Sequence, residues 1–147
     1  MPVPQLTHED KLDYTPTARS VSLARRRTAR LVAEWGQESI AGDVALIVSE
    51  LATNALLHGS LRGRLFRVRL VVSTATLRVE VSDPRGERLP RKRRGVVSTS
   101  GYGLVLVDGL ADRWGTEPRT VGKTVWAEVG LRERTVTRPY DPGRSSG

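Results

Sequence analysis

The segment from about Gly42 to His58 constrains the fold of this chain more than any other part of the sequence. With about 100° of rotation per residue, its main apolar positions form one helical stripe. These positions are Val44, Val48, Leu51 and Ala55. Leu46 and Leu57 make a further side apolar, and Gly59 follows as a stop signal. The pattern predicts a helix that is covered on more than one side, as in the core of a globular domain.

Polar side chains lie beside this apolar stripe. Glu50 and Asn54 are four residues apart, so they share one helical face. His58 continues the polar stripe, but a lone histidine at a helix end is more often a capping or packing residue, and we assign it no catalysis. Because burying polar groups without partners costs free energy, the stripe predicts a cleft at the margin of the core. A metal-bound nucleotide would provide such a partner.

Length and composition limit the class of protein. The chain has 147 residues, 38% of them apolar, no cysteine and a formal net charge of +8. One domain with a substantial core is therefore expected, and disulfides and Cys-ligated metals are excluded. No charged-then-apolar leader opens the chain, and no apolar run approaches the roughly 18 residues that span a bilayer. We expect a soluble cytoplasmic protein with no membrane partner.

The two ends of the chain differ from its middle. Residues 1–16 contain three prolines and little periodicity, which predicts a flexible N-terminal arm. From about Thr17 to Trp35, apolar residues recur every three or four positions and predict a helix that stops at Gly36. The arginines of this segment are interpreted as a solvated face. Residues 132–147 are charged and rich in Pro, Gly and Ser near their end, and we expect a disordered tail.

Alternating apolar residues predict three strands and thereby the fold class. Phe66–Val72 and Leu77–Val81 are close enough to form an antiparallel hairpin. Thr124–Leu131 forms a later strand, in which Val125, Ala127, Val129 and Leu131 alternate with Trp126 and Glu128. A third helix is predicted over Gly103–Trp114. The order helix, helix, strand, strand, helix, strand predicts an α+β two-layer sandwich with helices on one face of a mostly antiparallel mixed sheet. The domain is expected to span residues 17–131.

Three further pieces accompany the Glu50–Asn54 pair. Asp83 stands at the end of the second predicted strand. Gly101 and Gly103 lead into the third helix, whose first N–H groups favour phosphate. Gly122–Thr124 opens the last strand.

These four pieces, in this order, resemble the nucleotide-binding domain shared by gyrase, heat-shock protein 90 and histidine kinases, the GHKL-type superfamily. Val48–Ala55, Gly103–Leu104 with Trp114–Gly115, and Gly122–Trp126 are similar to one branch in particular. That branch contains the anti-sigma-factor serine/threonine kinases and short ATP-binding regulatory proteins. The resemblance covers roughly residues 18–131. It implies the histidine-kinase-like (Bergerat) ATPase fold, with ATP and Mg²⁺ as cofactors and residues 84–102 as a lid.

The resemblance also implies a role for each piece. Asn54 would ligate Mg²⁺ through its carboxamide oxygen, a hard ligand of the kind this ion prefers. Glu50 would act as the catalytic residue that orients or deprotonates the attacking hydroxyl. Asp83 would accept a hydrogen bond from the adenine amino group, and the Thr124 hydroxyl would support that contact through a water. The other implied cofactor-binding positions are Gly86, Gly101, Gly103 and Leu104.

Each of these residues also has an ordinary structural interpretation. Asn54 is able to cap its helix, and Glu50 is able to pair with an arginine. Asp83 is able to cap a loop, and Thr124 is able simply to begin a strand. Lys123 either reaches a phosphate or stays in solvent, and the sequence does not separate these two alternatives.

The leading prediction is an ATP- and Mg²⁺-binding regulatory protein that phosphorylates a serine of an antagonist protein. Its expected partners are a sigma factor, an anti-anti-sigma antagonist or both. The chain is also expected to be able to form a homodimer. Arg85 and Glu87 stand where the family usually has glycines, which favours as the alternative a non-catalytic protein-binding module with weak or lost nucleotide binding. Nucleic acid is the least favoured partner, because the chain has few aromatic residues and no recognised binding motif.

Overall fold

The computed structural model describes residues 6–59, 64–83, 102–118 and 122–131. The described elements are β1 His8–Tyr14, α1 Ala18–Glu34, α2 Glu38–Asn54, the π-helical turn η1 Ala55–Gly59, β2 Phe66–Val72, β3 Thr76–Asp83, α4 Tyr102–Leu110, β4 Arg113–Pro118 and β5 Lys123–Gly130. The predicted lid lies outside the described residues except for Tyr102, which begins α4. The predicted C-terminal tail lies outside them entirely.

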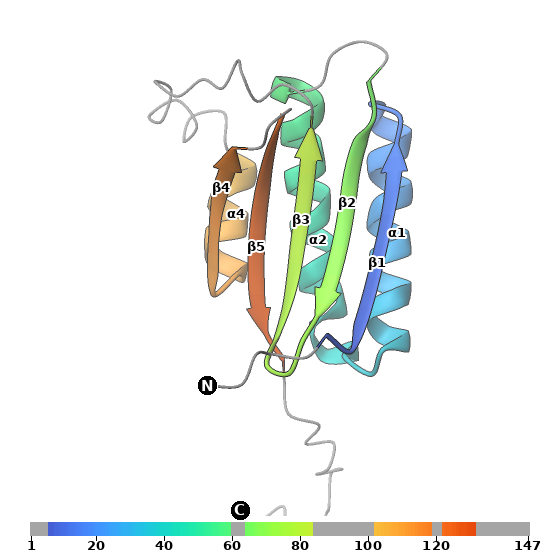
Figure 1. The fold of residues 1–147 in the computed structure, drawn as a ribbon, viewed down its shortest axis with the longest axis vertical. Coiled ribbons are helices and arrows are strands. Elements are labelled where there is room, and N and C mark those ends of the chain that lie inside the picture. The colour runs from blue at the N-terminus through green and yellow to red at the C-terminus, as the bar shows by residue number, and fades with distance from the viewer. Residues whose placement is uncertain (1–5, 60–63, 84–101, 119–121, 132–147) are drawn as a thin grey trace, which may run out of the picture.

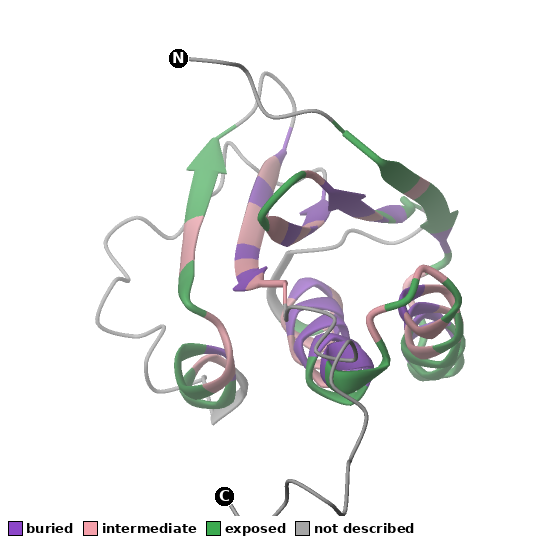
Figure 2. Cartoon of the chain, turned by 90° about the horizontal axis from the view of Figure 1, so that it is seen from below, coloured by how far each residue is buried: buried purple, intermediate pink, exposed green. Residues whose placement is uncertain are grey.

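The five strands form one sheet in the order β1-β2-β3-β5-β4, and every neighbouring pair is antiparallel. The predicted hairpin is formed by β2 and β3. All three described helices cover one face of the sheet, with α2 in the middle, α1 on the β1 side and α4 on the β4 side (Figures 1 and 2). This arrangement confirms the α+β two-layer sandwich, although the described sheet is antiparallel throughout rather than mixed.

Local sequence signals set both ends of α1. Thr17 is extended, with φ −135°, and its hydroxyl accepts a hydrogen bond from the backbone N–H of Ser20 at 3.1 Å. After the helix, Gly36 adopts φ +85°, a left-handed conformation that glycine takes without steric cost. The helix predicted over about Thr17 to Trp35 is therefore confirmed, with Thr17 and Trp35 as its two caps.

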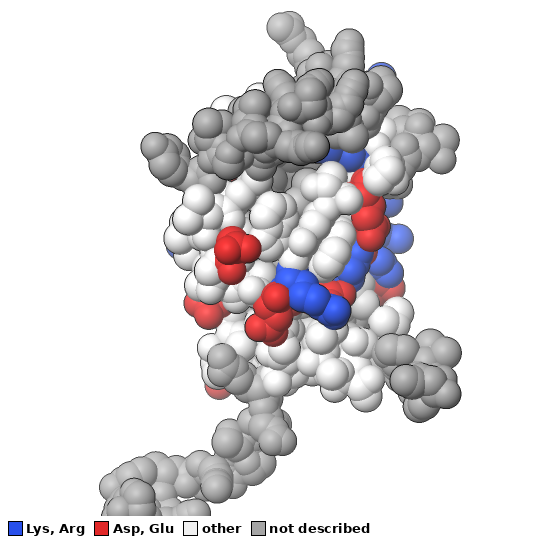
Figure 3. Space-filling view, turned by 90° about the vertical axis from the view of Figure 1, so that its left-hand side faces the viewer, with Lys and Arg blue, Asp and Glu red and all other residues white. Residues whose placement is uncertain are grey.

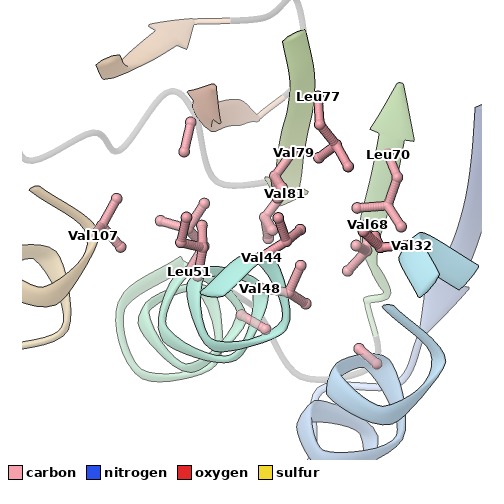
Figure 4. Close-up of a cluster of buried hydrophobic side chains, with 14 of the residues drawn as sticks. Val32, Val44, Val48, Leu51, Val68, Leu70, Leu77, Val79, Val81 and Val107 are labelled. Carbon is pink, nitrogen blue, oxygen red and sulfur yellow. The ribbon is translucent and has the colours of Figure 1, made fainter. Parts of the chain in front are cut away.

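α2 forms the centre of the core, as its apolar stripe predicts. Val44 and Val48 are fully buried, and Leu51 and Ala55 are 1% and 5% exposed. Val44, Val48 and Leu51 point from α2 toward the sheet (Figure 4) and belong to the same buried cluster as side chains of β2 and β3. The segment Glu38–Leu57 is long and apolar enough to cross a membrane, with mean hydropathy 1.5, but half of it is buried inside this domain. Its composition therefore fits the core helix of the sandwich.

Residues 8–14 form the edge strand β1, which corrects the prediction of a flexible arm for that part of residues 1–16. β1 pairs with β2 along its whole length. Its last residue, Tyr14, is buried and stacks on Phe66, with the ring centroids 5.5 Å apart. The segment is too polar to predict a strand by itself, because the residues that stabilise it lie far along the chain.

The outer face of the sheet carries a network of ion pairs that extends over all five strands. Its members are Glu9, Asp13, Arg67, Arg69, Arg78, Glu80, Arg113, Glu117 and Glu128. The Arg78 guanidinium donates to Glu80 at 2.8 Å and to Glu128 at 3.0 Å, and it lies 4.4 Å from the ring centroid of Trp126. Burial raises the pKa of Glu80, but hydrogen bonds from Arg78 and Arg69 outweigh burial and lower it. Figure 3, viewed from the β4 side of the molecule, shows acidic and basic side chains next to one another.

α4 ends before Trp114, which corrects the prediction of a helix that continues to that residue. Asp112 directs the chain into β4, because its N–H donates to the Glu128 carbonyl at 2.8 Å and its carboxylate accepts from the Gly130 N–H at 2.7 Å. The next residues are thereby aligned with β5. Trp114 lies in β4 and still packs against the core.

Candidate functional site

The ends of several elements bring predicted site residues to one end of the sandwich. β3 ends there with Asp83 and β5 begins there with Lys123, near the C-terminal end of α2 (Figure 1). η1 contacts β3, and α2 contacts both β3 and α4. α4 runs from this side toward the start of β4, so its first turn, which contains Gly103, lies toward the same end (Figure 1).

Asp83 is a buried carboxylate at the margin of the core. Only 4% of the residue is exposed. It lies two residues after Val81 and four after Val79, and both valines point to the α2 side of the sheet (Figure 4). Because side chains alternate along a strand, Asp83 is directed to the helix side as well. It thus provides a strong and directional hydrogen-bond acceptor at the end of the sandwich.

The structure does not bring Thr124 together with Asp83. The hydroxyl of Thr124 lies 2.7 Å from the hydroxyl of Ser82, which is directly opposite in the β3–β5 register. Ser82 is two residues after Glu80 in β3, so both side chains face the same side of the sheet. The side chain of Glu80 belongs to the ion-pair network on the outer face. Strand alternation turns this hydroxyl to the face of the sheet opposite Asp83, away from the adenine contact that the resemblance implies for it.

The residue of β5 that lies opposite Asp83 is Lys123. The next pair on the same side of the sheet is Val81 with Val125, and both valines contribute to the core. Lys123 itself is half-buried. The sequence already contained this signal, because a strand that turns Val125 toward the core also turns Lys123 to that side and Thr124 away from it.

Glu50 and Asn54 lie in the last turns of α2, at the border of its buried stripe. Both are partly exposed, whereas Leu51 and Ala52 between them are 1% and 0% exposed. Their spacing places them on one face of the helix, as predicted. The π-helical turn η1, which contains His58, begins directly after Asn54. Such turns are frequent at functional sites.

The predicted glycine positions are only partly described. Gly103 is the second residue of α4, where backbone N–H groups have no partner within the helix and are suited to bind an anion. Leu104 is partly buried and packs against the core. Gly86 and Gly101 lie outside the described residues.

The donor groups at this end of the sandwich fit a magnesium nucleotide. Asn54 offers a carboxamide oxygen, Asp83 offers a buried acceptor, and the start of α4 offers backbone N–H groups. Among the described residues, no three His, Cys, Asp or Glu side chains form a cluster that could hold a metal. Mg²⁺ at nucleotides is usually held by one or two protein oxygens together with phosphates and water, so one protein ligand is compatible with this ion.

Comparison with known protein families agrees with the fold. The family model described as a histidine kinase-like ATPase domain matches residues 14–129, from the last residue of β1 into β5. The matched span contains every predicted site residue. No curated protein matches the chain.

Proposed function

The chain belongs to the family of histidine kinase-like ATPase domains, and we propose that it is a regulatory protein that binds ATP with Mg²⁺. The observation that carries this proposal is the burial of the Asp83 carboxylate at the end of β3, at the same end of the sandwich as Asn54 on α2. A directional acceptor and an amide oxygen are the groups that a purine amino group and a phosphate-bound Mg²⁺ require.

Each described residue has one role in this proposal. Asp83 accepts a hydrogen bond from the adenine amino group, and Asn54 contributes an oxygen ligand to Mg²⁺. Backbone N–H groups around Gly103 bind phosphate oxygens at the start of α4. The bound magnesium nucleotide supplies the phosphoryl group and neutralises part of its charge.

We further propose that the chain acts as a serine/threonine kinase similar to the anti-sigma-factor kinases. Glu50 orients or deprotonates the serine hydroxyl of an antagonist protein, one helical turn before Asn54. Phosphoryl transfer depends mainly on positioning and charge neutralisation, and a carboxylate on a core helix is well positioned for this. The proposed partners are a sigma factor and an anti-anti-sigma antagonist in the cytoplasm, and transcription is regulated through their binding. Homodimer formation belongs to the same proposal.

Titration calorimetry with Mg-ATP tests the binding step. Asp83→Asn should weaken ATP binding at least about tenfold, because a hydrogen bond to a charged acceptor is replaced by one to a neutral amide. Asp43→Asn is the matched control, since Asp43 is an exposed carboxylate on α2. A wild-type protein that does not bind ATP, or an Asp83→Asn variant that binds like the wild type, would contradict the proposal.

Incubation with γ-labelled ATP and candidate antagonist proteins tests the kinase step. Glu50→Gln should retain ATP binding and reduce label transfer by roughly a hundredfold or more, as expected for loss of a general base. Equal labelling of the antagonist by the variant and the wild type would remove Glu50 from the mechanism without affecting ATP binding.

The second candidate is a non-catalytic protein-binding module of the same fold. Two observations favour it. Arg85 and Glu87 replace glycines that the family usually has after Asp83, and the Thr124 hydroxyl is bonded to Ser82 instead of lying beside Asp83. A ligand that binds only the native state raises the melting midpoint, so the absence of any shift at millimolar Mg-ATP would favour this module.

A further inference from the structure

β3 and β5 place a basic side chain opposite the buried carboxylate of the candidate site. Asp83 and Lys123 are directly paired in the antiparallel register. The Cβ atoms of such pairs are about 4.5–5.5 Å apart, and the two side chains project to the same face. Val81, two residues before Asp83, is 1% exposed in the core, which identifies that face as the helix side. Lys123 therefore projects toward the same space as Asp83.

Lys123 also differs from the cations of the outer face. Arg67, Arg69 and Arg78 are all held by carboxylates of the ion-pair network. Within the described ranges, no ion pair involves Lys123. Its side chain is half-buried at the start of β5. The Lys123 side chain thus starts from the face of the sheet that Asp83 occupies, and its ammonium forms no ion pair with a described carboxylate.

We propose that Lys123 binds the base end of the nucleotide beside Asp83, the position predicted for Thr124. This inference rests on the proposed ATP binding. Adenine presents an amino donor next to a ring-nitrogen acceptor, so a carboxylate acceptor beside an ammonium donor is the complementary arrangement. The register places Lys123 opposite Asp83, the residue proposed to bind the adenine amino group.

A ligand series measured by titration calorimetry separates the base end from the phosphate end. Adenosine, ADP and ATP are titrated into the wild type and into Lys123→Met, Lys123→Arg and Thr124→Val. Lys123→Met should weaken all three ligands by the same factor of about ten, because the lost hydrogen bond is to the base that they share. Lys123→Arg retains a donor and should keep most of the affinity. Thr124→Val is the matched control from the other face and should bind like the wild type.

Several outcomes would overturn this assignment while leaving ATP binding intact. A loss confined to ADP and ATP would place Lys123 at the phosphates. Unchanged binding by Lys123→Met, or an equal loss in Thr124→Val, would remove Lys123 from the base site. A wild-type protein that binds none of the ligands would contradict the proposed function itself. Melting curves without ligand check that each variant is folded, and Lys123→Gln gives the same comparison if Lys123→Met does not fold.

Discussion

Arg27 in α1 holds the carboxylate of Asp10 in β1 through two hydrogen bonds, 3.0 Å from Nε and 2.7 Å from Nη2. The hydrogen bonding to Asp10 raises the pKa of Arg27. Asp13, in the same strand, instead pairs with Arg67 of the outer-face network. The edge strand is therefore attached on both of its faces, to the helix layer through Asp10 and to β2 through Asp13.

Asp10→Asn should lower the free energy of unfolding by about 1 kcal/mol, because it removes a charged, two-bond contact that is only partly exposed. Urea denaturation at neutral pH measures the loss. Lys11→Gln is the control, since Lys11 is an exposed neighbour and should change stability by less than about 0.5 kcal/mol. Equal losses in the two variants would show that β1 does not depend on the Arg27 contact.

Glu80→Gln should destabilise the protein at pH 7 by about 1–2 kcal/mol and have a progressively smaller effect as the pH falls below 4.5. The pKa of Glu80 is lowered in the folded state from its ordinary value of 4.5. The unfolded chain therefore binds the proton more tightly, so this stabilisation is present above pH 4.5 and is lost as the pH falls through the folded pKa. Denaturation midpoints of wild type and variant, measured from pH 7 to pH 3, should converge on acidification. A constant gap would contradict the role of the charge.

Gly115→Ala should destabilise the protein by about 1 kcal/mol through overpacking. A Cβ at this position would lie 3.0 Å from Cζ2 of Trp126, whose ring is also covered by Arg78. Gly109→Ala is the matched control, because nothing lies within 4 Å of the added methyl group and alanine is favoured in a helix. Thermal melting should show a lower midpoint for Gly115→Ala and an unchanged or higher one for Gly109→Ala. The reverse order would contradict the packing described.

Asn54→Ala should remove the dependence of ATP binding on Mg²⁺ and leave the weaker binding without Mg²⁺ unchanged. The reason is that the carboxamide oxygen is the proposed protein ligand of the ion. Titrations with Mg²⁺ and with a chelator measure both values, and Thr53→Ala is a neighbouring, partly exposed control. An Asn54→Ala variant that still binds ATP more tightly with Mg²⁺ would exclude this ligand.

Local periodicity predicts most of the fold, but it does not predict the edge strands. α1, α2 and β5 follow from apolar repeats within their own sequences. β1 is polar and is stabilised by contacts with Arg27, Arg67 and Arg69, which lie elsewhere in the chain. β4 begins where Asp112 bonds to the backbone of β5, and no local pattern signals that contact.

The sequence predicts where Asp83, Glu50 and Asn54 lie in their elements, but it does not predict which residue lies beside Asp83. The end of β3 at Asp83 and the shared face of Glu50 and Asn54 follow from strand and helix patterns. The partner of Asp83 depends on the register between β3 and β5, which are separated by residues 84–122 of the chain. The family resemblance pointed to Thr124, whereas the alternation along β5 points to Lys123.

The alternation along β5 also limits how this protein can change in length. A one-residue slip of the whole of β5 against β3 would exchange its two rows of side chains. Glu128 would then enter the apolar interior, and Lys123 would leave the space beside Asp83. The same register keeps Glu128 out of the core and Lys123 on the face of Asp83. Insertions and deletions inside β3 or β5 should therefore be selected against, as point changes at the site are.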